Sequence, residues 1–142
     1  MSATSHLGPG SRVPAWVEAI DRECFGEAWG PLDEFEHIWT SAPFGFSRWR
    51  IIPEVREAEL LRLGVAAELR RGGHGRRLLR HAQYQLARMG VQVLHLEVRV
   101  SNAAARALYE SEGWVYQGLR KGYYRNGESA ALYSRVDQTF PG

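Results

Sequence analysis

A short run rich in arginine and glycine, residues 70–75, carries the residue types and spacing best suited to chemistry in this chain. It reads Arg-Arg-Gly-Gly-His-Gly, and an amphipathic helix pattern follows at once. Glycine lets backbone N–H groups approach a ligand, and the first N–H groups of a helix have no internal partner and carry partial positive charge. The combination predicts an anion site, most naturally for a pyrophosphate. The alternative is a solvated, arginine-rich helix start with a glycine turn.

Two commoner phosphate-binding loops do not match this run. A Walker loop ends in Gly-Lys-Ser/Thr, whereas Gly75 is followed by Arg76 and Arg77. A dinucleotide-binding fingerprint needs a third glycine at the position that Leu78 occupies. The spacing from Arg70 to Gly75 is instead Arg-x-x-Gly-x-Gly. It resembles the acyl-CoA pyrophosphate loop of the GNAT superfamily of N-acetyltransferases, written Gln/Arg-x-x-Gly-x-Gly/Ala.

A longer stretch, from Leu94 to Trp114, makes this resemblance specific. Its sequence, LHLEVRVSNAAARALYESEGW, resembles the corresponding part of the RimI family nearly residue for residue, and GYYRNGESA from Gly122 to Ala130 continues the match. RimI enzymes are GNAT acetyltransferases that modify the N-terminal amine of a ribosomal protein. The resemblance covers about residues 58–136. It implies an acetyl-CoA-dependent N-acetyltransferase that works by direct attack in a ternary complex, with a peptide or protein N-terminus as acceptor.

Glu97 is the candidate general base. Every second residue from Val93 to Glu97 faces one side of a predicted strand, so the carboxylate lies on the face opposite the strand's leucines. A free α-amine has a pKa of about 8 and lysine about 10.4, so most of an amine acceptor is protonated at pH 7 and a nearby base helps. The resemblance assigns that role to Glu97, acting through a water. A salt bridge with an arginine such as Arg99 or Arg62 is the alternative, and His95 is expected to line the site or pack there without being the base.

Tyr109 is the candidate general acid. The departing CoA thiolate must be protonated, and a phenol with a pKa near 10 can supply that proton. The resemblance assigns this role to Tyr109, whereas a core tyrosine on an amphipathic helix is the alternative.

The resemblance also implies the contacts with acetyl-CoA. Backbone groups of residues 63–65 are expected to run alongside the pantetheine, between two strands that splay apart. Asn102 opens the helix after the Glu97 strand and matches a family position that touches the pantetheine, although a plain N-cap needs no ligand. The predicted cofactor-binding residues are Leu63, Gly64, Val65, Arg70, Arg71, Gly72, Gly73, His74, Gly75, Arg76 and Asn102.

Composition sets broad limits on the class of protein. A chain of 142 residues with a net charge of +2 suggests one globular domain and is only weak evidence for nucleic-acid binding, so we expect no nucleic-acid and no membrane partner. The single cysteine, Cys24, excludes an internal disulfide and favours a reducing compartment. With no membrane-length apolar run and no apolar signal core, we expect a soluble, cytoplasmic protein. The five histidines show no paired ligand spacing, so we expect no metal.

The expected fold is a single-domain GNAT α/β fold, with a mixed, mostly antiparallel sheet splayed at its centre and flanked by helices. We expect a flexible arm at 1–13, at most one short strand, and an N-acetyltransferase domain at 14–137. The predicted helices begin at Pro14, run from Gly30-Pro31 through Trp39, span 75–89, and run from Ser101-Asn102 to near Glu112. The predicted strands are 44–52, 58–66, 91–100, 114–119 and 130–136. The sheet should therefore have five or six strands where the superfamily usually has seven.

Three other functions remain open at this level. Lysine or a small-molecule amine could replace the α-amine as acceptor. A non-catalytic acyl-CoA-binding protein would keep residues 70–75 without needing Glu97 and Tyr109. A nucleic-acid module should interleave aromatic with basic residues, and no aromatic residue stands between residue 70 and Tyr84 apart from the imidazoles. The sequence does not indicate the oligomeric state.

Overall fold

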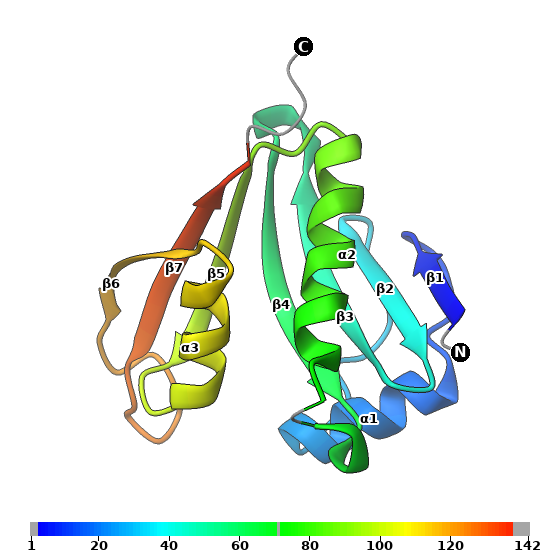
Figure 1. The fold of residues 1–142 in the computed structure, drawn as a ribbon, viewed down its shortest axis with the longest axis horizontal. Coiled ribbons are helices and arrows are strands. Elements are labelled where there is room, and N and C mark those ends of the chain that lie inside the picture. The colour runs from blue at the N-terminus through cyan, green and yellow to red at the C-terminus, as the bar shows by residue number, and fades with distance from the viewer. Residues whose placement is uncertain (1–2, 71, 138–142) are drawn as a thin grey trace.

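A twisted sheet forms the frame of the molecule (Figure 1). In the computed structural model, which describes residues 3–70 and 72–137, seven strands form one mixed sheet in the order β1-β2-β3-β4-β5-β7-β6. β4 and β5 are parallel, and all other neighbours are antiparallel. The strands are β1 (Ala3–Leu7), β2 (Glu36–Ala42), β3 (Gly45–Ile52), β4 (Glu57–Val65), β5 (Val93–Arg99), β6 (Val115–Arg120) and β7 (Ala130–Val136).

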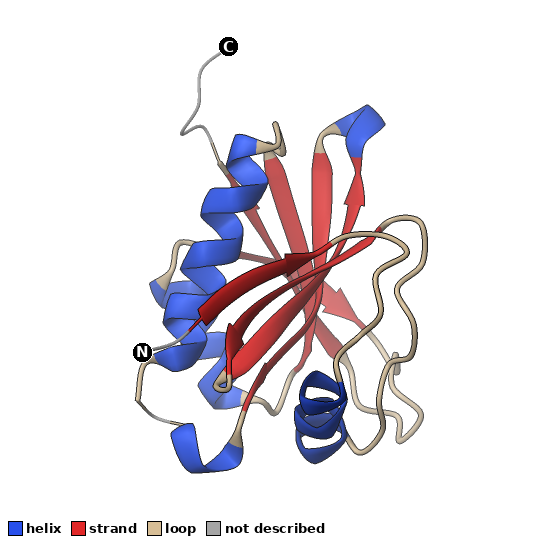
Figure 2. Ribbon diagram, turned by 90° about the vertical axis from the view of Figure 1, so that its right-hand side faces the viewer, coloured by secondary structure: helices blue, strands red, loops and turns tan. Residues whose placement is uncertain are grey.

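Helices cover both faces of this sheet. α2 (His74–Arg88) and α3 (Ala103–Ser111) lie on one face, and α1 (Ala15–Phe25) lies on the other, as Figure 2 shows for α1 and α2. Two short 3₁₀-helices, Pro53–Val55 and Ala67–Leu69, flank β4. No helix in the described part of the chain is long and apolar enough to cross a lipid bilayer.

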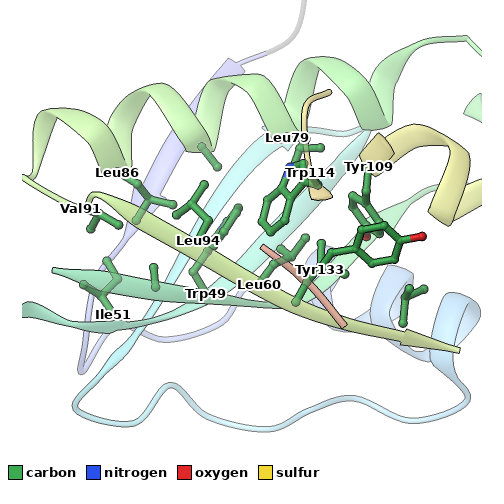
Figure 3. Packing of buried hydrophobic residues seen from close by; sticks show 14 of the residues in the cluster. Trp49, Ile51, Leu60, Leu79, Leu86, Val91, Leu94, Tyr109, Trp114 and Tyr133 are labelled. Carbon is green, nitrogen blue, oxygen red and sulfur yellow. The ribbon is translucent and has the colours of Figure 1, made fainter. Parts of the chain in front are cut away.

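The larger core lies between α2, α3 and the sheet (Figure 3). Leu79 and Leu86 of α2 are completely buried against Trp49 of β3 and Leu94 of β5. Burying a leucine side chain contributes about 1.5–3 kcal/mol, so this apolar stripe suffices to fix α2 on the sheet. The predicted helix at 75–89 is confirmed with its bounds shifted by one residue.

The helix predicted from Gly30-Pro31 through Trp39 is wrong. Residues 36–42 form β2, which pairs with β1 on one side and β3 on the other. The spacing of Leu32, Phe35 and Trp39 suits one stripe of a helix, but the consecutive residues Ile38 and Trp39 are both buried, in different clusters. Covering two opposite faces at neighbouring positions requires the two-residue period of a strand. Residues 26–35 therefore form an irregular loop.

The expected strand count of five or six is also wrong, because the described residues contain seven strands. β2 is one additional strand, in a segment that the sequence predicts to be a helix. β1 lies inside the arm expected at 1–13, and all five of its residues are in register with β2. The composition of this segment gives little strand signal. It forms a strand because β2 supplies the hydrogen bonds that hold it.

β4 and β5 separate halfway along their length. Only Glu57 to Leu60 of β4 are in register with β5, at Val93 to Leu96, and no pairing follows beyond that point. Next to the separation, β4 carries a bulge, because Arg48 of β3 faces Arg62 and the following Trp49 faces Leu60. A bulge bends its strand and increases its twist. The predicted splay is thus confirmed, and it opens the centre of the sheet.

Candidate active site

A cavity of about 600 Å³ lies where β4 and β5 separate. Its lining comes from both sides of the sheet. Asn102, Ala105 and Tyr109 contribute from the α3 side, and Phe25 and Trp29 contribute from the end of α1 and the loop after it. The remaining lining residues include Cys24, Glu59, Arg62, Leu63, Glu97, Arg99, Tyr123 and Tyr124. Two molecules approaching from opposite faces could therefore meet between the strands.

Glu97 lies in the wall of this cavity, on β5. Its side chain is 18% exposed, and Oε1 lies 3.1 Å from the Arg120 guanidinium of β6. A hydrogen bond from the Tyr123 hydroxyl to Glu97 raises the pKa of that tyrosine. The alternative partners expected from the sequence are engaged elsewhere, since Arg62 pairs with Asp21 and Arg99 with Glu128. The alternative salt bridge with an arginine is thus present, but its partner is Arg120, which the sequence did not single out.

Glu59 of β4 is a second carboxylate in the cavity and was missed from the sequence. Burial raises its pKa, and the nearby charge of Glu97 raises it further. In the parallel pairing, Glu59 lies directly opposite His95, which is two residues before Glu97 on β5. The sequence feature that could have identified Glu59 is its alternation with Glu57 on a central strand, where an unpaired carboxylate is costly. His95 itself hydrogen-bonds Glu57 at 2.6 Å and is absent from the cavity lining described above.

Tyr109 reaches the cavity from α3. Its side chain is 7% exposed and packs beside Trp114, with ring centroids 5.9 Å apart. Figure 3 shows it at the end of the core nearest α3. Burial raises the pKa of its hydroxyl further above neutral pH, so Tyr109 is protonated there and has a proton to donate. Tyr109 therefore lines the cavity and is also packed in the core, as the alternative interpretation expects, and its role as general acid stays a prediction.

The glycine-rich run leads into α2 as predicted. Gly73 has φ +79°, in the left-handed region, and occupies the N-cap of α2, so the first N–H groups of the helix follow directly. A Cβ on Gly75 would lie 3.8 Å from both Leu108 of α3 and Val65 of β4. The backbone at this junction therefore borders the space between α2, α3 and β4 with no side chain in the way.

The arginines of this run are engaged within the chain. The Arg70 guanidinium lies 3.1 Å from both the Val65 carbonyl and the Cys24 Sγ. Arg76 donates to Glu112, which Arg80 also contacts at 2.6 Å. The N–H groups of the glycines and of the helix start remain donors that an anion at this junction could use. Arg71, also predicted to bind the cofactor, lies outside the described residues.

Some of the other predicted cofactor-binding residues line the cavity, and others pack against neighbouring side chains. Leu63 lines the cavity, whereas a Cβ on Gly64 would come within 2.7 Å of the Phe46 ring, which explains that glycine by packing. His74 turns away and stacks on Phe44, with ring centroids 4.6 Å apart. Asn102 lines the cavity and also caps α3 by accepting from the Ala105 N–H at 3.2 Å.

Metal ligands do not gather in the described part of the chain, where no group of three or more His, Cys, Asp or Glu side chains could hold an ion.

A splayed seven-stranded sheet with a glycine-rich loop leading into the helix beside the splay defines a class of acetyltransferases. The chain belongs to the acetyltransferase (GNAT) family, whose pattern matches residues 13–114. The described fold agrees with this assignment over its whole length. The crystal structure of the ribosomal-protein-S18-alanine N-acetyltransferase from Escherichia coli superposes with a TM-score of 0.76 and 28% identity, covering 100% of both chains.

Curated relatives point to one branch of the family. The chain is 48% identical over 68 residues to the [ribosomal protein bS18]-alanine N-acetyltransferase of Escherichia coli strain K12, which is 48% of this chain and 46% of the relative. It is 44% identical over 85 residues to the N-alpha-acetyltransferase RimI of Mycobacterium tuberculosis, which is 60% of this chain and 52% of the relative. The match thus spans about half the length of these relatives.

Proposed function

We propose that this protein transfers the acetyl group of acetyl-CoA to the N-terminal α-amine of a protein. The observation that carries the proposal is the cavity between β4 and β5, which brings Glu97 and Tyr109 together from different elements. Family membership supports acetyl-CoA as the donor. The names of the relatives support an N-terminal α-amine as the acceptor, and that of the Escherichia coli relative supports a ribosomal protein as its carrier.

Acetyl-CoA would supply an activated thioester whose acetyl carbon an amine can attack. The residues present suit it: the N–H groups after Gly73 would hold the pyrophosphate, and Leu63 and Asn102 line the cavity where the pantetheine would lie. Gly75 carries no side chain of its own between Leu108 and Val65, which suits a ligand that approaches the backbone closely. Arg70, Gly72, Gly73, His74, Gly75 and Arg76 thus keep a proposed role in shaping this loop.

Glu97 would take the proton from the acceptor ammonium, directly or through a water. Arg120 and Tyr123 hold its carboxylate in place, and Glu59 adds negative charge that attracts the ammonium. About one α-amine in ten is already neutral at pH 7, so the base supplies a modest but useful gain. Tyr109, protonated at neutral pH, would give its hydroxyl proton to the departing sulfur.

The decisive experiment measures thiol release from acetyl-CoA, with the product identified by mass spectrometry. The acceptors are a peptide with a free N-terminal alanine, the same peptide with a blocked N-terminus and an internal lysine, and spermidine as a small amine. We expect turnover of the free N-terminus alone. Equal turnover of the blocked peptide would assign the chain to the lysine acetyltransferases. Acetyl-CoA binding by calorimetry without turnover of any acceptor would identify a non-catalytic binding protein.

A further inference from the structure

Asp21 of α1 is a buried carboxylate with both oxygens in use. The residue is 3% exposed and lies behind the cavity wall. Its Oδ1 accepts a hydrogen bond from the Arg62 guanidinium at 2.7 Å, and its Oδ2 accepts from the Trp29 backbone N–H at 2.7 Å. One carboxylate therefore ties a side chain of β4 to the loop that follows α1.

The Arg62 guanidinium connects two aromatic rings of the cavity wall. Its central carbon lies 4.6 Å from the centroid of the Phe25 ring and 4.8 Å from that of the Trp29 ring. A guanidinium over an aromatic face is attracted by the ring quadrupole. The same guanidinium donates to the Glu27 carbonyl at 2.9 Å. Arg62 thus fixes both rings and the backbone between them.

A second buried arginine supports the same loop from the neighbouring strand. Arg48 of β3 faces Arg62 in the sheet and is 1% exposed. It donates to the Gly30 and Pro31 carbonyls at 2.8 Å each and pairs with Glu36 at 2.7 Å. Its guanidinium lies 5.5 Å from the Trp29 ring centroid. Two buried ion pairs therefore hold residues 26–35 against the sheet.

The rings held in this way line the same cavity as Glu97. Phe25 is 42% exposed and Trp29 is 40% exposed, which leaves broad apolar surface facing the space where an acceptor amine would approach the carboxylate. Because Asp21 neutralises Arg62, this wall offers aromatic surface without net charge. An apolar side chain next to the reacting amine would bury that surface, whereas an acidic one would gain little from a paired guanidinium.

We propose that Asp21 is a positioning residue for the acceptor, which holds Arg62 and Trp29 as one neutral aromatic wall that selects acceptors with an apolar first side chain. The inference rests on the proposed function, since it takes the amine to be an N-terminal one. Asp21 acts through Arg62 and Trp29 and has no contact with the reacting atoms.

The test is steady-state kinetics of Asp21→Asn with two peptides that differ only in their first residue, methionine or aspartate. Wild type should prefer the methionine peptide. The asparagine keeps the shape but leaves the Arg62 charge uncompensated, so KM for the methionine peptide should rise about tenfold while acetyl-CoA affinity is unchanged. The ratio of kcat/KM for the aspartate peptide to that for the methionine peptide should also rise about tenfold. A merely structural role would lower both peptides' rates together.

Two further variants keep the test decisive. Asp33→Asn makes the same change at a half-exposed carboxylate in the loop that Asp21 supports, outside the cavity lining, and it should leave the peptide preference unchanged. Arg62→Met should raise KM for the methionine peptide with no gain for the aspartate peptide, even if Asp21→Asn proves too unstable to assay. Unchanged KM and preference in folded Asp21→Asn or in Arg62→Met would overturn the inference. Absence of turnover by wild type would instead overturn the proposed function.

Discussion

The two sides of the central cavity are built in different ways. On the α2 and α3 side, apolar side chains such as Leu79, Leu86 and Trp114 form a continuous core. On the α1 side, a smaller apolar cluster that includes Leu32 is joined by the ion pairs Asp21–Arg62 and Glu36–Arg48, which hold the loop at residues 26–35. An apolar core tolerates exchanges of similar volume, whereas a buried charge depends on one partner and breaking such a pair costs about 3–5 kcal/mol.

This difference separates the expected roles of the two sides. The apolar side carries the helix start that suits acetyl-CoA, the donor that family membership supports. The charged side carries the aromatic wall that an acceptor would meet. The proposed cofactor side can thus rest on an apolar pattern that many sequences satisfy, while the proposed acceptor side also needs a few matched charges.

Gly75→Val tests the cofactor side alone and should have the largest effect. A branched side chain at Gly75 would enter the space bounded by Leu108 and Val65, so we expect acetyl-CoA affinity to fall on the order of a thousandfold. Calorimetry measures the affinity. Gly75→Ala, whose Cβ makes only ordinary contacts at 3.8 Å, is the matched control and should bind nearly normally. Normal affinity in a folded Gly75→Val protein would falsify the placement of the pyrophosphate.

Tyr109→Phe tests the point where the two sides meet. It keeps the ring and its packing on Trp114 but removes the hydroxyl, so kcat should fall on the order of a hundredfold. Acetyl-CoA affinity should be retained, and the melting temperature should be near that of wild type. A large drop in the melting temperature with a proportionate loss of activity would show instead that Tyr109 serves packing alone.

Glu97→Gln tests the acceptor side and should have a smaller effect at pH 7. We expect kcat/KM to fall about tenfold to a hundredfold, because some acceptor amine is already neutral and Glu59 still attracts it. The deficit should shrink as the pH rises, since more amine is then neutral. Glu57→Gln is the matched control, because Glu57 contacts His95 outside the cavity lining. A pH–rate profile parallel to that of wild type would argue against Glu97 as the base.

Glu59→Gln should have the smallest effect, on stability. Burial and the charge of Glu97 raise the pKa of Glu59 above its usual value of 4.5, so its ionised form destabilises the folded state at neutral pH. The variant should therefore melt slightly higher than wild type at pH 7. The difference should vanish below pH 4.5, where the carboxyl is protonated in both the folded and the unfolded state. Melting curves at several pH values measure this, and a pH-independent difference would contradict it.

Much of the cofactor side could be predicted from the sequence. The helix after residue 73, the strand at 93–99 and the capped helix at 103–111 each depend on residues close together in the chain. Glu97 and Tyr109 fall on adjacent elements of that segment, and the structure brings both to one cavity. Their catalytic roles and the cofactor contacts remain predictions.

The acceptor side could not be predicted in the same way. Glu59, Arg120 and the Phe25–Trp29 wall were missed, and residues 31–39 were read as a helix. Leu32, Phe35 and Trp39 satisfy a helical spacing, and nothing local shows that both faces of β2 are to be buried. Arginines are abundant along the chain, so the sequence could not say which one each carboxylate meets.

The sequence by itself determined the elements whose causes are local: an apolar period that makes α2, a glycine that ends the loop before it, and an asparagine that caps α3. Only the tertiary structure decided the splay of β4 from β5, the place of β1 and β2, and the pairing of Asp21 with Arg62 across 41 residues. Local propensity acts within a few residues, so its effects can be predicted from the order of residues in the sequence. Charge pairing and strand pairing act through space, where any distant partner of suitable chemistry competes until the chain has folded.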